Sequence, residues 1–389
     1  MRIALLNIQY YPNVEGGAEI STQKLAEELA KSNDVYVIAD GEYTGEYKTV
    51  NNVKVIRMPA RIKYHNKIER VLTRCYKIQC YKLLKYILSE IQPDVLHTNN
   101  LHEFSVIVWK VAYELKIPVV HTLRDYTLLQ TVRRYEQLIH KFYSNTVSIA
   151  TAPSHFTLEV FKRRGYFKKS MKCIAIPNAI DVNKEKFQSR LEYAYNKPDN
   201  SIIKFAFLGR YHKDKGVDWL ISVFDMIKIN AELHLFGKGE LTKESINILS
   251  KNNKIFDHGF LKEDCLLKEL ENIDVIVAPS LWDEPFGRVI LDGYKNACPV
   301  IITNRGGMPE VIDDKKTGII LNDETNQSLA EALIFMSQRK NIKNMLPFIK
   351  EKLKDYTVLE QAKSFTNMYK LAIENRNYKE VKKWLIRSL

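Results

Sequence analysis

The stretch RIALLNIQYYPNVEGGAEISTQKLAEELAKSNDVYVIA, residues 2–39, decides the fold class. RIALLNI (2–8) and DVYVIA (34–39) are short apolar runs that predict buried strands. Between them, EGGAE (15–19) places glycines at a turn, and ISTQKLAEELAKS (20–32) spaces its apolar side chains as a helix does. This order is typical of the start of a doubly wound parallel sheet.

The same alternation continues along the chain and divides it in two. Further strands are expected at 94–99, 118–123 and 148–153, and a second series begins with IKFAFLGR (203–210) and includes AELHLFGKG (231–239), DVIVAPS (274–280) and PVIITN (299–304). We therefore predict an α/β protein with two Rossmann-like parallel-sheet domains, residues 1–182 and 202–356. The polar stretch 183–201 is expected to be a linker, and a basic helical segment, 357–389, to pack back onto the first domain.

The composition is that of a soluble globular chain. Of the 389 residues, 45% are hydrophobic and 27% charged, and no apolar run approaches the roughly 20 residues that a membrane helix needs. The N-terminus lacks the long apolar region of a signal peptide, so a cytoplasmic location is expected. The cysteines are scattered without a C-x-x-C pair, which favours buried free thiols over disulfides or a metal site.

The net charge of +13 is concentrated in the first domain. Residues 57–85 hold nine Lys or Arg and one acid, and FKRRGYFKKSMK (161–172) holds six bases and no acid. An anionic membrane surface or an acidic ligand fits this charge, whereas no nucleic-acid-binding signature accompanies it. Between Lys67 and Ile87, helical spacing puts one set of apolar residues on one face: Ile68, Val71, Leu72, Cys75, Leu83 and Ile87. The bases Arg70, Arg74, Lys77 and Lys82 lie elsewhere on the helix. This pattern predicts either a membrane-surface helix or a core helix with a basic side.

Two basic residues follow the first strand of the second domain. Arg210 and Lys215 bracket the loop GRYHKDKG (209–216), flanked by glycines. A guanidinium and an ammonium at the end of a strand can stabilise the charge that grows on a diphosphate leaving group.

Two acids lie eight positions apart in EPFGRVILDG (284–293). Glu284 follows a predicted strand, Pro285 suits the first turn of a helix, and the N–H groups of residues 287–289 would face the crevice. Asp292, more than a turn further along, could reach another part of the same ligand. Carboxylates accept hydrogen bonds from hydroxyl groups, so a sugar and a ribose are fitting ligands.

Glycine pairs begin two of the predicted helices. Gly16 and Gly17 lie before the first helix, where free N–H groups favour phosphate, although a dinucleotide-binding G-x-G-x-x-G spacing is absent. A second pair occurs in NRGGMPEVI (304–312), and FGKGE (236–240) is typical of a tight turn.

Taken together, these motifs resemble the GT-B-fold glycosyltransferases, most closely the retaining enzymes of family 4. Eight stretches carry the resemblance in family order: GGAE (16–19), PVVHTLRDY (118–126), APSHFT (152–157), IPNAID (176–181), GRYHKDKG (209–216), FGKGE (236–240), EPFGRVILDG (284–293) and GGMPEVI (306–312).

The resemblance implies two domains facing a central cleft, a UDP- or GDP-sugar donor and no metal. By it, Arg210 and Lys215 hold the pyrophosphate, Glu284 the donor sugar, and Asp292 the ribose. It also implies contacts with the donor from residues of the same motifs: Gly16, Gly17, Phe286, Gly287, Arg288 and Val289. The acceptor would be a lipid-linked or polysaccharide glycan of the cell surface.

Two positions depart from the family pattern. Asp292 is one methylene shorter than the usual glutamate, and Arg124 stands where the family carries histidine, next to Asp125. Arg124 and Asp125 are the expected catalytic positions of the first domain, and His121 is expected in its core. A nucleotide-sugar epimerase and a catalytically silent sugar-nucleotide binding protein are the alternative functions.

Overall fold

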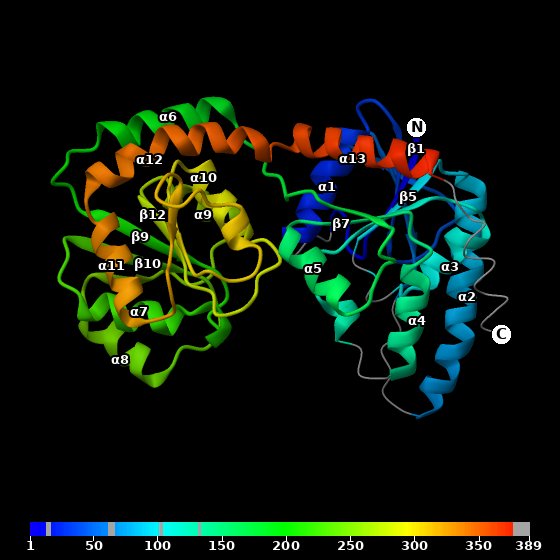
Figure 1. Cartoon of the computed structure of the whole chain (residues 1–389), viewed down its shortest axis with the longest axis horizontal. Helices are drawn as coiled ribbons and strands as arrows, with labels where there is room; N and C mark the ends of the chain where they lie inside the picture. The colour runs from blue at the N-terminus through cyan, green and yellow to red at the C-terminus, as the bar shows by residue number, and fades with distance from the viewer. Residues whose placement is uncertain (13–16, 61–66, 100, 102–103, 131–133, 376–389) are drawn as a thin grey trace. The chain divides into compact units, whose positions relative to one another are not determined.

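The computed structural model of the chain describes residues 1–12, 17–60, 67–99, 101, 104–130 and 134–375; for residues 17–18, 67–78, 134–136 and 263–264 it describes the backbone alone. The chain forms two compact units, Met1–Pro177 with Val358–Leu389, and Asn178–Thr357. Figure 1 shows a separate twisted sheet in each unit.

Unit 1 is built on a sheet of order β3-β4-β2-β1-β5-β6-β7-β8. Only β3 runs antiparallel, beside β4. The strands are β1 (Arg2–Leu6), β2 (Asp34–Asp40), β3 (Lys48–Val50), β4 (Val53–Met58), β5 (Val95–Thr98), β6 (Val119–Thr122), β7 (Ile149–Ala152) and β8 (Lys172–Ala175). The strand order reverses between β1 and β5, the place where such sheets bind ligands.

Helices cover both faces of this sheet (Figure 1). One face packs against α1 (Gly17–Leu29) and α13 (Val358–Glu374), which touch each other; the other packs against α2 (Lys67–Ile91) and α3 (Ile107–Glu114). The remaining helices are α4 (Arg134–Ser144), α5 (His155–Arg163) and the short η1 (Thr127–Leu129).

Unit 2 has a wholly parallel sheet of order β11-β10-β9-β12-β13-β14. Its strands are β9 (Ile203–Leu208), β10 (Ala231–Phe236), β11 (Ile255–Asp257), β12 (Val275–Ala278), β13 (Val300–Ile302) and β14 (Gly318–Ile320). Its helices are α6 (Lys184–Asn196), η2 (Lys213–Lys215), α7 (Val217–Met226), α8 (Lys243–Lys251), α9 (Glu263–Leu270), α10 (Arg288–Lys295), η3 (Met308–Glu310), α11 (Asn326–Met336), α12 (Arg339–Lys352) and η4 (Leu353–Tyr356). Here the order reverses between β9 and β12.

The stretch 183–201 differs from the expected linker, because most of it is α6. Asn183 caps this helix: its side chain accepts a 2.9 Å hydrogen bond from the Lys186 N–H. Phe187, Leu191 and Ala194 lie on one helical face and are buried in the core of unit 2. Three apolar residues at helical spacing are enough to attach an otherwise polar helix.

The first domain also ends earlier than expected and is completed by the C-terminal segment. The chain leaves unit 1 after Pro177 and returns at Val358, so the boundary at residue 182 is displaced. Phe365 and Tyr369 of α13 are fully buried against the strands of unit 1. Residues 376–389 lie outside the described part of the chain.

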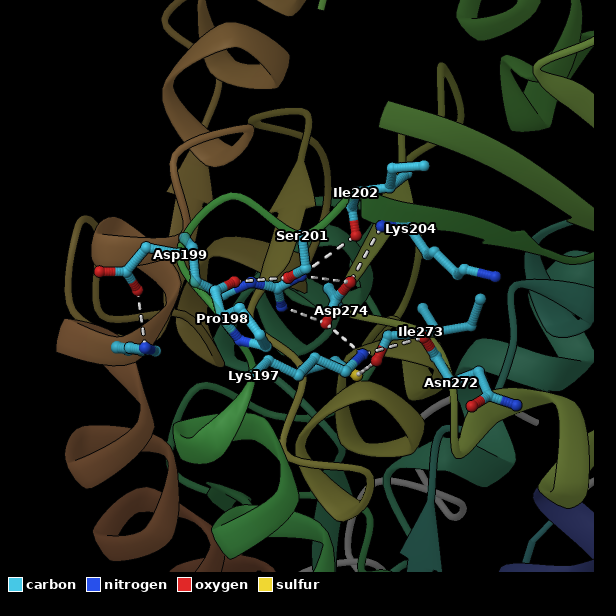
Figure 2. Close-up of polar contacts among 12 residues, drawn as sticks. Lys197, Pro198, Asp199, Ser201, Ile202, Lys204, Asn272, Ile273 and Asp274 are labelled. Atoms are coloured by element: carbon cyan, nitrogen blue, oxygen red, sulfur yellow. Dashed lines mark hydrogen bonds and ion pairs between the residues drawn. The ribbon is translucent and has the colours of Figure 1, made fainter. Parts of the chain in front are cut away.

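A buried ionic network fixes the start of α12 to the base of the unit 2 sheet (Figure 2). Asp274, which precedes β12, lies 2.5 Å from Nη1 of Arg339 and 2.8 Å from Nζ of Lys197. Its second oxygen accepts a 3.0 Å hydrogen bond from the Lys204 N–H. Arg339 also donates to Ser201 and to the Ile202 carbonyl. Since the carboxylate is almost inaccessible, each of these bonds offsets its desolvation.

The basic surface of unit 1 is only partly described. Residues 68–77 of the predicted amphipathic helix lie outside the described side chains, whereas Leu83 and Ile87 pack into the core of the unit. Most bases of the 161–172 cluster are exposed. No described helix is long and apolar enough to cross a bilayer.

The expectation of buried thiols is wrong for Cys265, which is exposed in α9. Cys298 is buried, Cys80 and Cys173 are half-buried, and all of these described cysteines are free. Cys75 falls among the residues whose side chains are not described.

Candidate functional site

A pocket of about 180 Å³ opens in unit 2 where β9 and β12 end. This is the point at which the strand order reverses, so neighbouring loops diverge and leave room for a ligand. Three chain segments line it: Phe207, Leu208, Gly209 and Lys215; Ala278, Ser280, Glu284, Gly287, Arg288 and Val289; and Met308.

Lys215 and Glu284 meet in this pocket. The Lys215 ammonium forms an ion pair with Oε1 of Glu284, and both side chains are about one-fifth exposed. Ser280 supports the pair, since its hydroxyl lies 3.3 Å from the same carboxylate oxygen and 3.2 Å from the Asp214 carbonyl. The structure thus brings together a partly exposed cation, a partly exposed carboxylate and a buried hydroxyl that supports the carboxylate.

Glycines allow the loops around the pair to approach closely. Gly216 ends η2 in a left-handed conformation (φ 70°), and a Cβ there would overlap the Pro279 carbonyl. Gly306 (φ 60°) lies directly against the backbone of Glu284, and the Gly307 N–H donates a 2.7 Å hydrogen bond to the Glu284 carbonyl. The second glycine pair therefore holds the Glu284 loop in place.

The helix after Glu284 begins later than the sequence indicates. Gly287 (φ 83°) is the N-cap of α10, and its first helical residue is Arg288, so Pro285 precedes the first turn. Phe286 is buried against Tyr356 and anchors the loop. The N-terminus of α10 consequently borders the pocket at residues 287–289, where the positive end of the helix dipole favours an anion.

The other two predicted donor residues lie apart from this pocket. Arg210 is exposed in the loop after β9, and Asp292 is half-buried on α10. Neither is among the described residues that line the pocket.

In unit 1, Arg124 follows β6 at the carboxyl edge of the sheet. Its Nε donates a 3.2 Å hydrogen bond to Asn99, and its Nη1 lies 3.4 Å from the hydroxyl of Ser21 on α1. Asp125 accepts a 2.9 Å hydrogen bond from the Thr127 N–H and one from the Thr127 hydroxyl, so this carboxylate ties Asp125 to the first residue of η1. Gly17 is the first residue of α1, and Gly16 lies outside the described residues.

Two asparagines beside Arg124 escaped the sequence analysis. Asn7 and Asn99 follow β1 and β5, which are paired in the sheet, and both side chains are about 99% buried. Within the described residues, Oδ1 of Asn7 and Nδ2 of Asn99 have no hydrogen-bond partner. Buried polar atoms normally have partners, so this edge of unit 1 is suited to a polar ligand or ordered water. Their position at the carboxyl ends of the predicted strands was the available signal.

Two histidines lie beneath this edge as neutral core residues. His121 is buried with Nδ1 2.8 Å from the Thr98 hydroxyl, and burial lowers its pKa to about 3. His97 lies between Tyr369 and Thr122, 2.7 Å from each hydroxyl. Burial, reinforced by the charge of Arg124, lowers the pKa of His97 well below its usual value.

Comparison with known proteins agrees with this arrangement. Residues 15–184 match the family model described as Glycosyltransferase Family 4, and residues 203–339 match Glycosyl transferases group 1. An uncharacterized 42.6 kDa protein in the cps region of Klebsiella pneumoniae is 30% identical, over 80% of this chain and 87% of its own. The chain belongs to glycosyltransferase family 4. It is therefore a transferase.

Solved structures show the fold of the family. Sucrose-phosphate synthase from Thermosynechococcus elongatus superposes with a TM-score of 0.71 at 17% identity, covering 95% of this chain and 98% of that one. Anabaena HepE, solved in complex with UDP and glucose, superposes with a TM-score of 0.66 at 16% identity, covering 95% and 99%. The fold of this family member is thus GT-B, with two Rossmann-like domains.

Proposed function

We propose that this enzyme transfers a sugar, with retention of configuration, from a nucleotide-sugar donor to a lipid-linked or polysaccharide acceptor in cell-surface glycan synthesis. The ion pair of Lys215 and Glu284 in the pocket between β9 and β12 carries the proposal. It supplies a cation for a diphosphate and a carboxylate for sugar hydroxyls at adjacent points of one site. The HepE complex with UDP and glucose and the cps-region relative support the donor class and the pathway.

In the proposed reaction, the bond between the sugar's anomeric carbon and the β-phosphate oxygen breaks. Lys215, with Arg210 from the same loop, stabilises the negative charge that develops on the diphosphate, without a metal. The acceptor hydroxyl attacks the anomeric carbon on the face that the diphosphate leaves, and its proton passes to a β-phosphate oxygen. Glu284 orients the donor sugar, and Asp292 binds the ribose.

Unit 1 binds the acceptor in this scheme. We assign Arg124, held by Asn99 and Ser21, to the polar edge that faces the acceptor. Asp125 holds the loop that carries Arg124, since its carboxylate accepts a hydrogen bond from the Thr127 N–H. Gly16 and Gly17 belong to the same edge, at the start of α1. The exposed bases of residues 161–172 give this unit a surface that attracts anionic membrane lipids.

The test is a panel of UDP- and GDP-sugars incubated with the purified chain, with and without membrane extract and with and without EDTA. We expect release of the nucleoside diphosphate from one donor, faster with extract and unchanged by EDTA, and an α-linked product from an α-linked donor. An isomerised sugar on an intact diphosphate would show an epimerase instead. Donor binding without turnover in the presence of extract would overturn the enzymatic proposal.

A further inference from the structure

A second pocket lies in unit 1 between β2, β4 and the C-terminal end of α2. Its volume is about 200 Å³. Four tyrosines and two glutamates give it its chemical character: Tyr36, Tyr43, Tyr47, Tyr86, Glu46 and Glu90. It is separate from the edge that carries Arg124, because Tyr36 packs on the α2 side of the sheet and Arg124 lies on the α1 side.

The tyrosines form an accessible aromatic lining. The rings of Tyr36 and Tyr47 meet edge-to-face, with centroids 6.1 Å apart. Tyr47 and Tyr86 are 51% and 53% exposed, which is unusual for two large rings in one small pocket. Tyr43, Tyr86 and Glu90 line the same pocket, and burial, together with the nearby Tyr86 and Glu90, raises the pKa of Tyr43.

Charged groups accompany the aromatic rings: Glu46 and Glu90 line the pocket, whereas Lys54 lies beside two of the rings without being a lining residue. The Lys54 ammonium lies 4.6 Å from the centre of the Tyr36 ring and 5.5 Å from that of Tyr47, paired with Asp34 at 2.7 Å. Glu46 and Glu90 make no ion pair with any described residue. Their carboxylates are exposed acceptors on the rim of the aromatic lining.

This combination suits a sugar better than a cation. Aromatic faces pack against the C–H face of a sugar ring, while carboxylates accept hydrogen bonds from its hydroxyls and phenol groups both donate and accept them. An organic cation needs the ring faces, but Lys54 already places a cation over two of them. The volume is below the roughly 300 Å³ at which pockets for drug-sized ligands begin, so a single sugar ring fits.

We propose that this pocket binds one neutral sugar residue of the acceptor glycan, away from the site of transfer. The proposal rests on the function proposed above, in that the acceptor is a glycan. It adds a second attachment point on the chain of the acceptor, which raises the effective concentration of its reactive end at the transfer site.

Binding of neutral tetrasaccharides to the full-length chain tests this pocket. Tetrasaccharides of glucose, galactose, mannose and N-acetylglucosamine are titrated by calorimetry and saturation-transfer NMR, with tetramethylammonium as the cationic probe. We expect saturable binding of at least one tetrasaccharide. Tyr86→Ala and Glu90→Gln should each weaken it about tenfold, by loss of a stacking ring or a charged acceptor. Tyr86→Phe should retain most of the affinity, and Tyr195→Ala, an exposed tyrosine of unit 2, should change nothing.

Three outcomes would overturn the inference: no tetrasaccharide binds, the pocket variants bind like the wild type, or tetramethylammonium binds in place of sugars. Thermal unfolding of each variant shows whether the fold is intact, and Glu90→Gln serves as the readout of weakened binding if Tyr86→Ala is unstable. Release of nucleoside diphosphate is measured on the same samples. If nucleoside diphosphate is released normally but the pocket variants bind glycan like the wild type, only the proposal of the sugar-binding pocket is refuted. If glycan binding depends on the pocket but no nucleoside diphosphate is released, only the proposed transferase function is refuted.

Discussion

Lys215 and Glu284, 69 residues apart in the chain, form an ion pair inside the proposed donor pocket. Each side chain thereby compensates the charge of the other before a ligand arrives. A diphosphate would draw the ammonium away and leave the carboxylate to accept hydrogen bonds from the sugar. Donor binding and rearrangement of this pair are therefore expected to occur together.

Replacing Lys215 tests its assignment to the leaving group. Lys215→Ala should lower kcat on the order of 100-fold, because the diphosphate loses a fixed positive charge in the transition state. Lys213→Ala is the matched control, since Lys213 is an exposed lysine of the same turn and is not among the pocket residues. Steady-state assays of nucleotide release measure both; equal rates for the two variants would remove Lys215 from the mechanism.

Gly306 should be required for the position of Glu284. In Gly306→Ala the new Cβ overlaps the Glu284 backbone, so we expect lower stability and most of the activity lost. Gly259→Ala is the control that separates backbone strain from steric overlap. Gly259 has a similar φ of 63°, but a Cβ added there would meet no other atom. The control should cost only about 1 kcal/mol of unfolding free energy. Urea unfolding and the release assay compare the two, and similar losses would argue against the steric role.

The difference in burial predicts a large difference in stability contribution between two ion pairs of unit 2, Arg339–Asp274 and Lys343–Asp199. Arg339→Met should cost about 3 kcal/mol of unfolding free energy, because it removes a partner from a carboxylate that is almost wholly buried. Lys343→Met should cost less than about 0.5 kcal/mol, since its partner Asp199 is 78% exposed. Chemical denaturation measures both values. Comparable losses would mean that burial does not govern this network.

Two neutral core histidines predict a loss of stability in mild acid. The folded-state pKa values of His97 and His121 lie below the unfolded value of about 6.5. Between those values the unfolded chain binds more protons, so the free energy of unfolding should fall as the pH drops below about 6.5. Each histidine contributes at most about 1.4 kcal/mol per pH unit.

Urea unfolding between pH 7.5 and pH 5 measures this slope above the range in which carboxylates titrate. His121→Asn removes one of the two groups, so the difference in protons bound by the unfolded and folded chains, which sets the slope of stability against pH, should fall by up to one. The variant should also be less stable at pH 7.5, because a buried contact is lost. A wild-type stability that is flat across this range would contradict the assignment of both histidines as neutral in the folded state.

Much of the fold was predictable because periodicity is local. The β9 and β12 strands, the loop of Lys215 and that of Glu284 all follow from short apolar runs and the residues after them. The short edge strands β3, β8, β11 and β14 were missed, and so was β4, whose apolar residues are interrupted by Lys54 and Arg57. The α6 helix was missed because its composition is polar and only its spacing is helical.

The contacts within the site were less predictable. The Lys215–Glu284 pair depends on how β9 and β12 are aligned across the sheet, and the support of Glu284 by Gly306 depends on a third loop. The orphaned atoms of Asn7 and Asn99 become visible only when burial is known. The types of residue in the site could be predicted from the sequence, whereas the contacts between them depend on tertiary packing.

The route of the chain through the two units has a consequence for the order of folding during synthesis. All of unit 2 is made before α13 emerges from the ribosome, and the bridge between Ile180 and Thr357 brings the two ends of unit 2 together. Unit 2 can therefore reach its native state first. Until Phe365 and Tyr369 have been synthesised, unit 1 exposes the apolar face that these residues cover in the folded protein. Because chaperones bind exposed apolar surface, we expect them to bind unit 1 at this stage.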